Sequence, residues 1–175
     1  MRKYIAMPIA ALILAAAILL AGYNGLDSYR EQRLQQELTA KMQTLLPGST
    51  TFTPEEYTGE DANIRLVFKG ETGYVIQTVT GGYAGDITML IGVSNEGKVT
   101  GLQVRQMRET YGLGAEALTD WEFLAQFLNT EGDVTVGTDV DSLTGATVTS
   151  KAIARSVNSA VGFVTGADGD SGATS

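Results

Sequence analysis

The sequence contains no cysteine and no histidine, and these absences exclude several kinds of chemistry. Without cysteine, the chain forms no disulfide and carries no lipid on a thiol. Without either residue type, we expect no zinc, haem or iron–sulfur site within the chain. No histidine is available as a general base to activate a hydroxyl group. We therefore expect no metal site and assign no catalytic residue.

Positive charge is also scarce, which bears on the partners of the protein. Twelve Lys and Arg residues stand against 20 Asp and Glu residues, for a net charge of -8. Such a balance argues against nucleic acid as a partner. The length of 175 residues allows one folded domain besides a membrane anchor.

Charge is missing altogether from residues 4–23, an apolar run that follows Arg2 and Lys3. This length suffices for a helix to cross a bilayer. A cleaved signal peptide shares the basic start and the apolar core, but no clear cleavage site ends the run. We expect residues 1–23 to be a retained single-pass membrane anchor. The positive-inside rule places the N-terminus in the cytoplasm and the remaining chain outside it.

Residues 24–46 have a helical pattern and are expected to form an amphipathic connector. Ser28 and Glu31 have the spacing of a capping box, and Pro47-Gly48 ends the pattern. The apolar stripe that packs on the domain comprises Leu34, Leu38, Met42 and Leu45.

The middle of the chain alternates with the period of β-strands. The pattern predicts strands over residues 64–69, 74–80, 87–93 and 99–106, and the nearly continuous apolar third run favours an interior position. The short glycine-containing turns leave no room for crossover helices, so we expect an antiparallel meander. A helix is predicted over residues 115–129, with Trp121 in the core and Phe123 at the edge of the apolar face. A short strand follows over residues 133–137. The predicted class is α+β, with helices flanking the sheet.

Residues 141–150 combine three threonines and two serines around a Gly-Ala step, and a second amphipathic pattern follows them. Its apolar positions are Ile153, Val157, Val161 and Val164. We expect the hydroxyl groups to lie on a tight loop before the helix N-terminus, where free amides and the helix dipole favour an anion. An ordinary turn with an N-cap is the alternative on this evidence alone.

The whole string, Asp-x-x-Thr-Gly-Ala-Thr-x-Thr-Ser, resembles the flavin-attachment motif of the FMN-binding domains of the RnfG and NqrC subunits of respiratory complexes. The resemblance implies that Thr147 is esterified to the phosphate of FMN. It places Asp141, Thr144, Gly145, Ala146, Thr149 and Ser150 around this cofactor. Because a threonine hydroxyl is a poor nucleophile without a base, attachment implies a separate flavin transferase, which Asp141 helps to recognise.

Two further segments are similar to the same family. One runs from Gly82 to Gly101, and the other is Arg-Glu-Thr-Tyr-Gly-Leu-Gly at residues 108–114, where Tyr111 occupies the usual place of proline. In the second segment the resemblance implies flavin-binding roles for Glu109, Thr110, Gly112, Leu113 and Gly114. The similarity spans residues 47–165, which we expect to form the extracytoplasmic FMN-binding domain.

The resemblance implies a membrane-anchored electron carrier, one component of a larger assembly rather than a complete enzyme. The expected assembly is an Rnf-type complex, in which other membrane subunits couple electron transfer between ferredoxin and NAD to ion translocation. Alternatives are an NqrC-type subunit of the sodium-pumping quinone reductase and a standalone extracytoplasmic flavoprotein. A hydrolase using Ser150 with Lys151, or a flavin-free binding module, is a further alternative, although adjacent helical residues do not face each other.

Residues 166–175 contain only Gly, Ala, Asp, Ser and Thr, a composition typical of a disordered tail. They nevertheless repeat the core Asp-x-x-Ser/Thr-Gly-Ala-Thr, which ends at Thr174. A chance match is the simpler interpretation, because no helix follows to receive a phosphate. A second attachment site at Thr174 is the alternative.

The charge asymmetry around residues 4–23 generates a prediction about topology. An alkaline phosphatase domain fused after Ser175 is expected to be active, because this enzyme matures only outside the cytoplasm. A reporter that works only in the cytoplasm, fused at the same residue, is expected to be silent. The reverse pattern of activities would contradict the proposed orientation.

Overall fold

The computed structural model describes residues 36–83, 85–107, 120–143 and 145–166. The chain divides into two compact units, Met1–Ala40 and Lys41–Ser175. Residues 36–45 are helical, as the pattern of this stretch predicts. None of the described helices has the length and hydropathy of a membrane span. The expected anchor, residues 1–23, lies outside the described residues.

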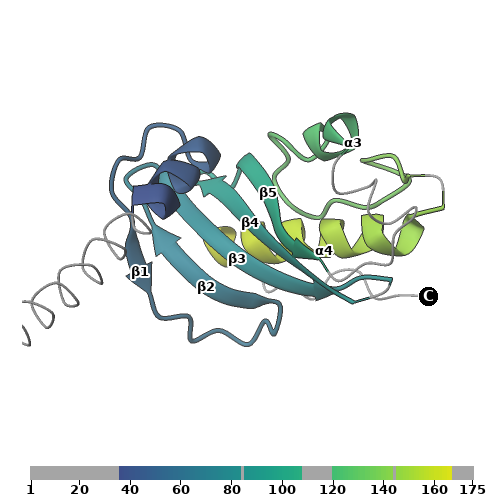
Figure 1. Ribbon diagram of the computed structural model, residues 1–175, viewed down its shortest axis with the longest axis horizontal. Coiled ribbons are helices and arrows are strands. Elements are labelled where there is room, and N and C mark those ends of the chain that lie inside the picture. Colours follow the sequence, from purple (N-terminus) through teal and green to yellow (C-terminus); the bar gives the residue numbers. More distant parts are fainter. Residues whose placement is uncertain (1–35, 84, 108–119, 144, 167–175) are drawn as a thin grey trace, which may run out of the picture. The chain divides into compact units, whose positions relative to one another are not determined.

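A five-stranded antiparallel sheet in the order β1-β2-β3-β4-β5 forms the centre of the second unit (Figure 1). The strands are β1 (Thr53–Glu55), β2 (Ile64–Lys69), β3 (Gly73–Gly81), β4 (Asp86–Ser94) and β5 (Val99–Met107). The four predicted strands and the meander are confirmed, and β4 pairs on both sides as expected. Strand β1 was not predicted, because its three exposed residues carry no alternation and include Pro54, a residue tolerated at a sheet edge.

Helix α4 (Thr147–Thr165) packs along one face of the sheet and provides much of the core. Figure 1 shows it crossing behind the strands. Several of its inward residues are small, among them Ala152, Ser156 and Ala160, and buried hydroxyl groups bond across the interface. The Thr80 hydroxyl lies 3.0 Å from the Ala152 carbonyl oxygen and 2.9 Å from the Ser156 hydroxyl. The Asn63 amide donates to the Ser159 hydroxyl at 3.1 Å.

The opposite face of the sheet is covered at one end by residues 41–46. Gly92 and Gly101 pair directly across β4 and β5, and the Leu45 backbone lies against both glycines. The Thr100 hydroxyl donates to the Leu45 carbonyl oxygen at 2.6 Å. Since a side chain at Gly92 would meet this backbone, glycine is what permits the contact.

The Glu71 carboxylate holds residues 50–51, which follow the Leu45 contact in the chain. It accepts hydrogen bonds from the backbone N–H and hydroxyl groups of Thr50 and Thr51, at 2.9 to 3.3 Å. Hydrogen bonds from the Glu71 backbone amide and then from Thr50 and Thr51 lower the pKa of Glu71 to about 2. The carboxylate therefore stays ionised and ties residues 50–51 to the β2–β3 turn.

Helix α3 (Trp121–Ala125) differs from the helix predicted over residues 115–129. Residues 115–119 lie outside the described part of the chain, and Asp120 caps α3 by accepting from the backbone N–H groups of Glu122 and Phe123. The expectation that Trp121 lies in the core is wrong, because its side chain is 69% exposed. Phe123 and Phe127 are buried there instead, since Asp120 starts the helix and turns its first residue outward.

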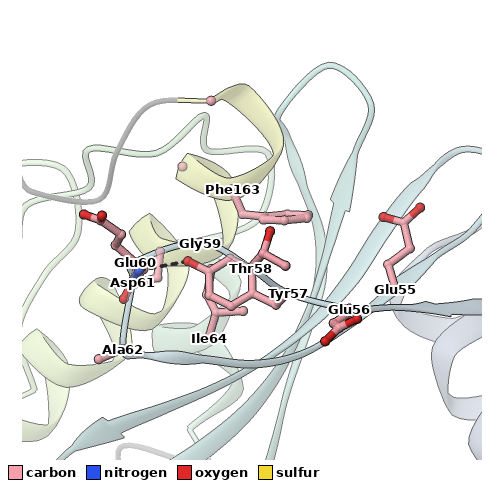
Figure 2. A pocket seen from close by; sticks show the side chains of 13 residues that line it. Glu55, Glu56, Tyr57, Thr58, Gly59, Glu60, Asp61, Ala62, Ile64 and Phe163 are labelled. Atoms are coloured by element: carbon pink, nitrogen blue, oxygen red, sulfur yellow. Dashed lines mark hydrogen bonds between the residues drawn. The ribbon is translucent and has the colours of Figure 1, made fainter.

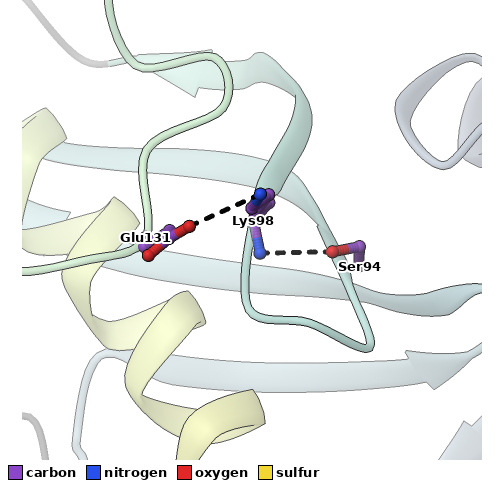
Figure 3. Close-up of polar contacts among 3 residues, drawn as sticks. All are labelled: Ser94, Lys98 and Glu131. Atoms are coloured by element: carbon purple, nitrogen blue, oxygen red, sulfur yellow. Dashed lines mark hydrogen bonds and ion pairs between the residues drawn. The ribbon is translucent and has the colours of Figure 1, made fainter.

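The segment after α3 runs beside β5 and does not form a strand. Figure 3 shows Lys98 linking the two regions: its ammonium lies 3.5 Å from the Glu131 carboxylate, and its backbone N–H donates to the Ser94 hydroxyl at 3.2 Å. The strand predicted over residues 133–137 is wrong. Only an isolated bridge between Val136 and Val140 forms there, because Gly137 adopts a φ of 91° and reverses the chain.

The Gly92 contact predicts a site-specific loss of stability. Gly92→Ala places a Cβ 2.1 Å from the Leu45 carbonyl oxygen, so we expect destabilisation of about 2–3 kcal/mol from overpacking. The matched control is Gly81→Ala, where nothing lies within 4 Å of the added Cβ. Urea denaturation of both variants tests this. Equal stability losses would contradict the backbone contact.

Candidate functional site

The site predicted around residues 141–150 lies where α4 begins. Gly145 has a φ of 79°, and the first helical hydrogen bond runs from the Ser150 N–H to the Ala146 carbonyl oxygen at 2.9 Å. Thr147, Thr149 and Ser150 therefore belong to the first turn of the helix. The expectation that these three hydroxyl groups lie on a loop before the helix is wrong, because the left-handed glycine makes the turn earlier than the apolar pattern indicated.

The helical period sends the hydroxyl groups of this turn in opposite directions. Thr147 is exposed, whereas Thr149 and Ser150 are both 0% exposed. The Ser150 hydroxyl donates to the Ala146 carbonyl oxygen at 3.0 Å and accepts from the Leu143 N–H at 3.3 Å. Ser150 thus holds the loop onto the helix. Because Ser150 is buried and Lys151 is exposed, the geometry gives no support to a hydrolase that pairs them.

The Thr149 hydroxyl is an unusual feature of the turn. Its oxygen is buried and has no hydrogen-bond partner among the described residues. An unpaired buried hydroxyl costs free energy that a partner would recover. The third residue of a helix is also one whose backbone N–H has no partner within the helix. Hydrogen-bond donors without a partner, namely backbone N–H groups and the Thr149 hydroxyl, are therefore concentrated at this end of α4.

The helix end has no compensating negative charge of its own. Ala146, the N-cap, has no side-chain oxygen to accept from the first amides, and the first turn contains no acidic residue. Lys151 and Arg155 follow Thr147 at four-residue steps and are exposed on the same face. The Arg155 guanidinium donates to the Gly81 carbonyl oxygen at 2.9 Å, which holds it beside the β3–β4 hairpin. The amides, the dipole and Lys151 all favour an anion at this end, whereas Arg155 lies two turns further along the helix.

Two amide side chains that the sequence analysis missed position the loop. The Asn158 side chain bonds both backbone groups of Val134, at 2.9 and 3.1 Å, as a neighbouring strand would. The Gln126 side chain accepts from the Asp141 N–H at 2.8 Å. Neither residue belongs to the motif at residues 141–150, so only the folded structure shows that they position this loop. The Asp141 side chain itself is exposed.

The structure brings together only part of the predicted site. Asp141, Gly145, Ala146, Thr147, Thr149 and Ser150 lie at or beside the start of α4. Thr144 and the second predicted segment, with Glu109, Thr110, Gly112, Leu113 and Gly114, lie outside the described residues. Within the described part of the chain, no three His, Cys, Asp or Glu side chains come together as ligands for a metal ion.

An FMN phosphate fits the chemistry of this helix end. The exposed Thr147 hydroxyl is the only one among the described hydroxyls of the first turn that a phosphate ester can leave in solvent. The ester retains one negative charge, which suits an uncapped helix N-terminus. The described residues thus provide an accessible hydroxyl group beside backbone donors that suit a phosphate.

Comparison with known proteins supports a flavin site in the same region. The family model of the FMN-binding domain matches residues 82–162, which include β4, β5, α3 and most of α4. The chain is 31% identical over 169 residues to the G subunit of the ion-translocating oxidoreductase complex of Methanosarcina acetivorans, covering 89% of both chains.

Two other relatives carry more specific names. The chain is 29% identical over 174 residues to the G subunit of the Na(+)-translocating ferredoxin:NAD(+) oxidoreductase complex of Acetobacterium woodii, covering 85% of this chain and 84% of the relative. It is 39% identical over 99 residues to the G subunit of the proton-translocating ferredoxin:NAD(+) oxidoreductase complex of Clostridium ljungdahlii, covering 53% of each.

Proposed function

The chain belongs to the family of FMN-binding G subunits of ion-translocating oxidoreductase complexes, and from this premise we propose that it is a membrane-anchored electron-transfer flavoprotein with FMN attached covalently to Thr147. The observation that carries the proposal is the exposed Thr147 hydroxyl at the uncapped start of α4, inside the matched domain. The other described hydroxyls of that turn are buried.

Attachment is a phosphoryl transfer to the Thr147 hydroxyl. The bond from Thr147 Oγ1 to phosphorus forms, and the bond from phosphorus to the leaving group of an activated flavin nucleotide breaks. The hydroxyl proton goes to a base, and since the chain has no histidine we assign this base to a separate flavin transferase. The exposed Thr147 and Asp141 are both accessible to such an enzyme.

Once attached, the phosphate would be held by the residues of the first turn. The free amides of Thr147 and its helical neighbours would stabilise the anion, and Lys151, one turn further along the exposed face, would add a positive charge. When bound, FMN supplies the redox chemistry, since its isoalloxazine ring accepts and donates electrons. The rigid packing of α4 on the sheet fixes the point from which the flavin extends.

The names of the relatives support a place in an Rnf-type complex with other membrane subunits. The relatives include both sodium- and proton-translocating assemblies, so the similarity favours the architecture of the complex and not a particular ion. The apolar run over residues 4–23 supports an anchor that keeps the domain near its electron donor and acceptor.

Thr147→Ala is expected to abolish covalent FMN while changing stability by less than about 0.5 kcal/mol, because the side chain is exposed. The matched control is Thr149→Val, which removes a buried hydroxyl of the same turn and keeps the side-chain shape. Intact mass spectrometry after co-expression with a flavin transferase measures the adduct. An adduct retained by the Thr147 variant would refute the assignment, and one lost only from the Thr149 variant would move it by two residues.

The repeated core ending at Thr174 tests whether folded context defines the site. Only Thr147 starts a described amphipathic helix, so removing residues 167–175 is expected to leave one FMN per chain, the same as in the full-length protein. The truncation keeps Gly166, whose φ of 71° ends α4. Mass measurement and peptide mapping give the result. Two flavins on the full-length protein, or FMN on Thr174, would show that the short string alone is recognised.

A further inference from the structure

The segment that leads into Thr147 is anchored in the core at both ends and exposed between them. Val140 and Ala146 are 2% and 4% exposed and belong to the hydrophobic core. The described residues that follow Val140, 141–143 and 145–147, are here termed the acceptor segment. Apart from Ala146 they are exposed or half-buried. Hydrogen bonds to the backbone of this segment therefore set its shape, since its side chains contribute little burial.

Ser150 holds the acceptor segment from the first turn of α4. Its hydroxyl donates to the Ala146 carbonyl oxygen at 3.0 Å, a bond that serine often makes within a helix. The same hydroxyl accepts from the Leu143 N–H at 3.3 Å, which lies outside the helix. Because Ser150 is 0% exposed and its only O–H donor is used, it is not a donor to a phosphate in solvent. Ser150 acts on Thr147 only through the backbone.

Gln126 holds the same segment from the end of α3, where it is the C-cap. Its side-chain oxygen accepts from the Asp141 N–H at 2.8 Å. Phe123 and Phe127 are buried, with ring centroids 5.4 Å apart, and fix the end of α3 from which Gln126 extends. Side chains from two different helices therefore hold backbone N–H groups of one short segment.

The far end of α4 is held independently of the acceptor segment. Figure 2 shows Phe163 beside Tyr57, and their ring centroids are 5.8 Å apart. The ring centroids of Phe163 and Tyr74 are 5.5 Å apart. The Tyr57 hydroxyl also accepts from the Asp61 N–H at 2.9 Å, the dashed line in Figure 2. Because these contacts do not involve the acceptor segment, loss of a bond to that segment is expected to leave the packing of α4 in place.

We propose that Ser150 and Gln126 are positioning residues for flavin attachment, an inference that rests on the proposed covalent FMN at Thr147. They hold the acceptor segment in the shape in which the Asp141 carboxylate and the Thr147 hydroxyl meet the flavin transferase together. Asp141 precedes Thr147 by six residues, which in a free chain span up to about 20 Å. Without the two bonds, the spacing of the exposed groups would vary.

The assignment predicts which kinetic constant of attachment changes. With flavin adenine dinucleotide as the donor, the bond from Thr147 Oγ1 to the FMN phosphorus forms and the phosphoanhydride bond breaks. AMP leaves with the electron pair, and the hydroxyl proton goes to the transferase. Ordering the acceptor segment raises the fraction of chains that are competent to bind, and the apparent KM varies inversely with that fraction. The kcat of the bound chain does not depend on it.

The test measures attachment to the full-length protein in detergent, after expression without a flavin transferase. Intact mass spectrometry follows the adduct after addition of transferase and flavin adenine dinucleotide. Ser150→Ala is expected to raise the KM for the chain about three- to tenfold. Gln126→Leu, whose lost bond is exposed to water, is expected to raise it about two- to threefold. Since Gln126 lies on the surface, this variant tests the proposal even where Ser150→Ala folds poorly.

Two control variants make the same changes elsewhere. Ser159→Ala removes a buried hydroxyl near the other end of α4, which accepts from the Asn63 side chain at 3.1 Å. Gln43→Leu removes an exposed amide that donates to the Thr50 carbonyl oxygen at 3.3 Å. Both are expected to leave the KM unchanged, whatever their stability in urea. Gln126→Glu keeps an acceptor oxygen and is expected to restore the wild-type KM at raised ionic strength, which screens its added charge.

Hydrogen–deuterium exchange of the flavin-free protein tests the two bonds without attachment. Ser150→Ala is expected to speed exchange of the Leu143 amide about three- to tenfold, and Gln126→Leu to speed that of the Asp141 amide. Ser159→Ala is expected to change neither amide.

Three results would overturn the assignment of Ser150 and Gln126 alone: unchanged exchange in their variants, equal KM values for Ser150→Ala and Ser159→Ala, or a loss confined to kcat. Equal KM values for Gln126→Glu and Gln126→Leu would remove Gln126 from the proposal. Absence of FMN from the wild-type protein would overturn the attachment site and this assignment with it. The failure of the positioning residues and the failure of the flavin site are therefore separate results.

Discussion

The packing of α4 against β3 and β4 is the interaction on which the rest of the structure depends. Small residues such as Ala152, Ser156 and Ala160 bring the helix close enough for hydroxyl groups to bond across the interface. The bonds from Thr80 and Asn63 satisfy polar groups that burial would otherwise penalise. Because these contacts hold the helix in one orientation, they also decide which residues of its first turn face solvent.

The N-terminal end of α4 lacks local interactions that would stabilise it. A serine, threonine or aspartate at the cap would satisfy amides that Ala146 leaves open, and a cap contributes about 1 kcal/mol. Thr149 adds a buried hydroxyl without a partner among the described residues. Departures from local consistency of this kind concentrate at functional sites. A phosphate on Thr147, as proposed above, would use the free amides of this turn, whereas the Thr149 hydroxyl is buried away from it.

The two ends of α4 differ in charge. Free amides make the first turn positive, with Lys151 one turn further on, whereas the last turns adjoin residues 55–62, which include Glu55, Glu56, Glu60 and Asp61.

Local patterns in the sequence determined the strands, the meander and the position of the attachment motif. Alternating side chains and glycine turns are properties of neighbouring residues, and β2 to β5 followed them closely. The same patterns misplaced Trp121 and the strand at residues 133–137, because a single cap at Asp120 and a left-handed Gly137 outweighed the periodicity.

Only the tertiary structure decided which hydroxyl is accessible. Thr147 and Thr149 are indistinguishable as chemical groups, and the face that α4 turns to the sheet exposes one and buries the other. The contacts of Asn158 and Gln126 likewise depend on segments far apart in the chain. No local sequence pattern predicts such contacts, because they arise from the packing of helix and sheet and not from the order of adjacent residues.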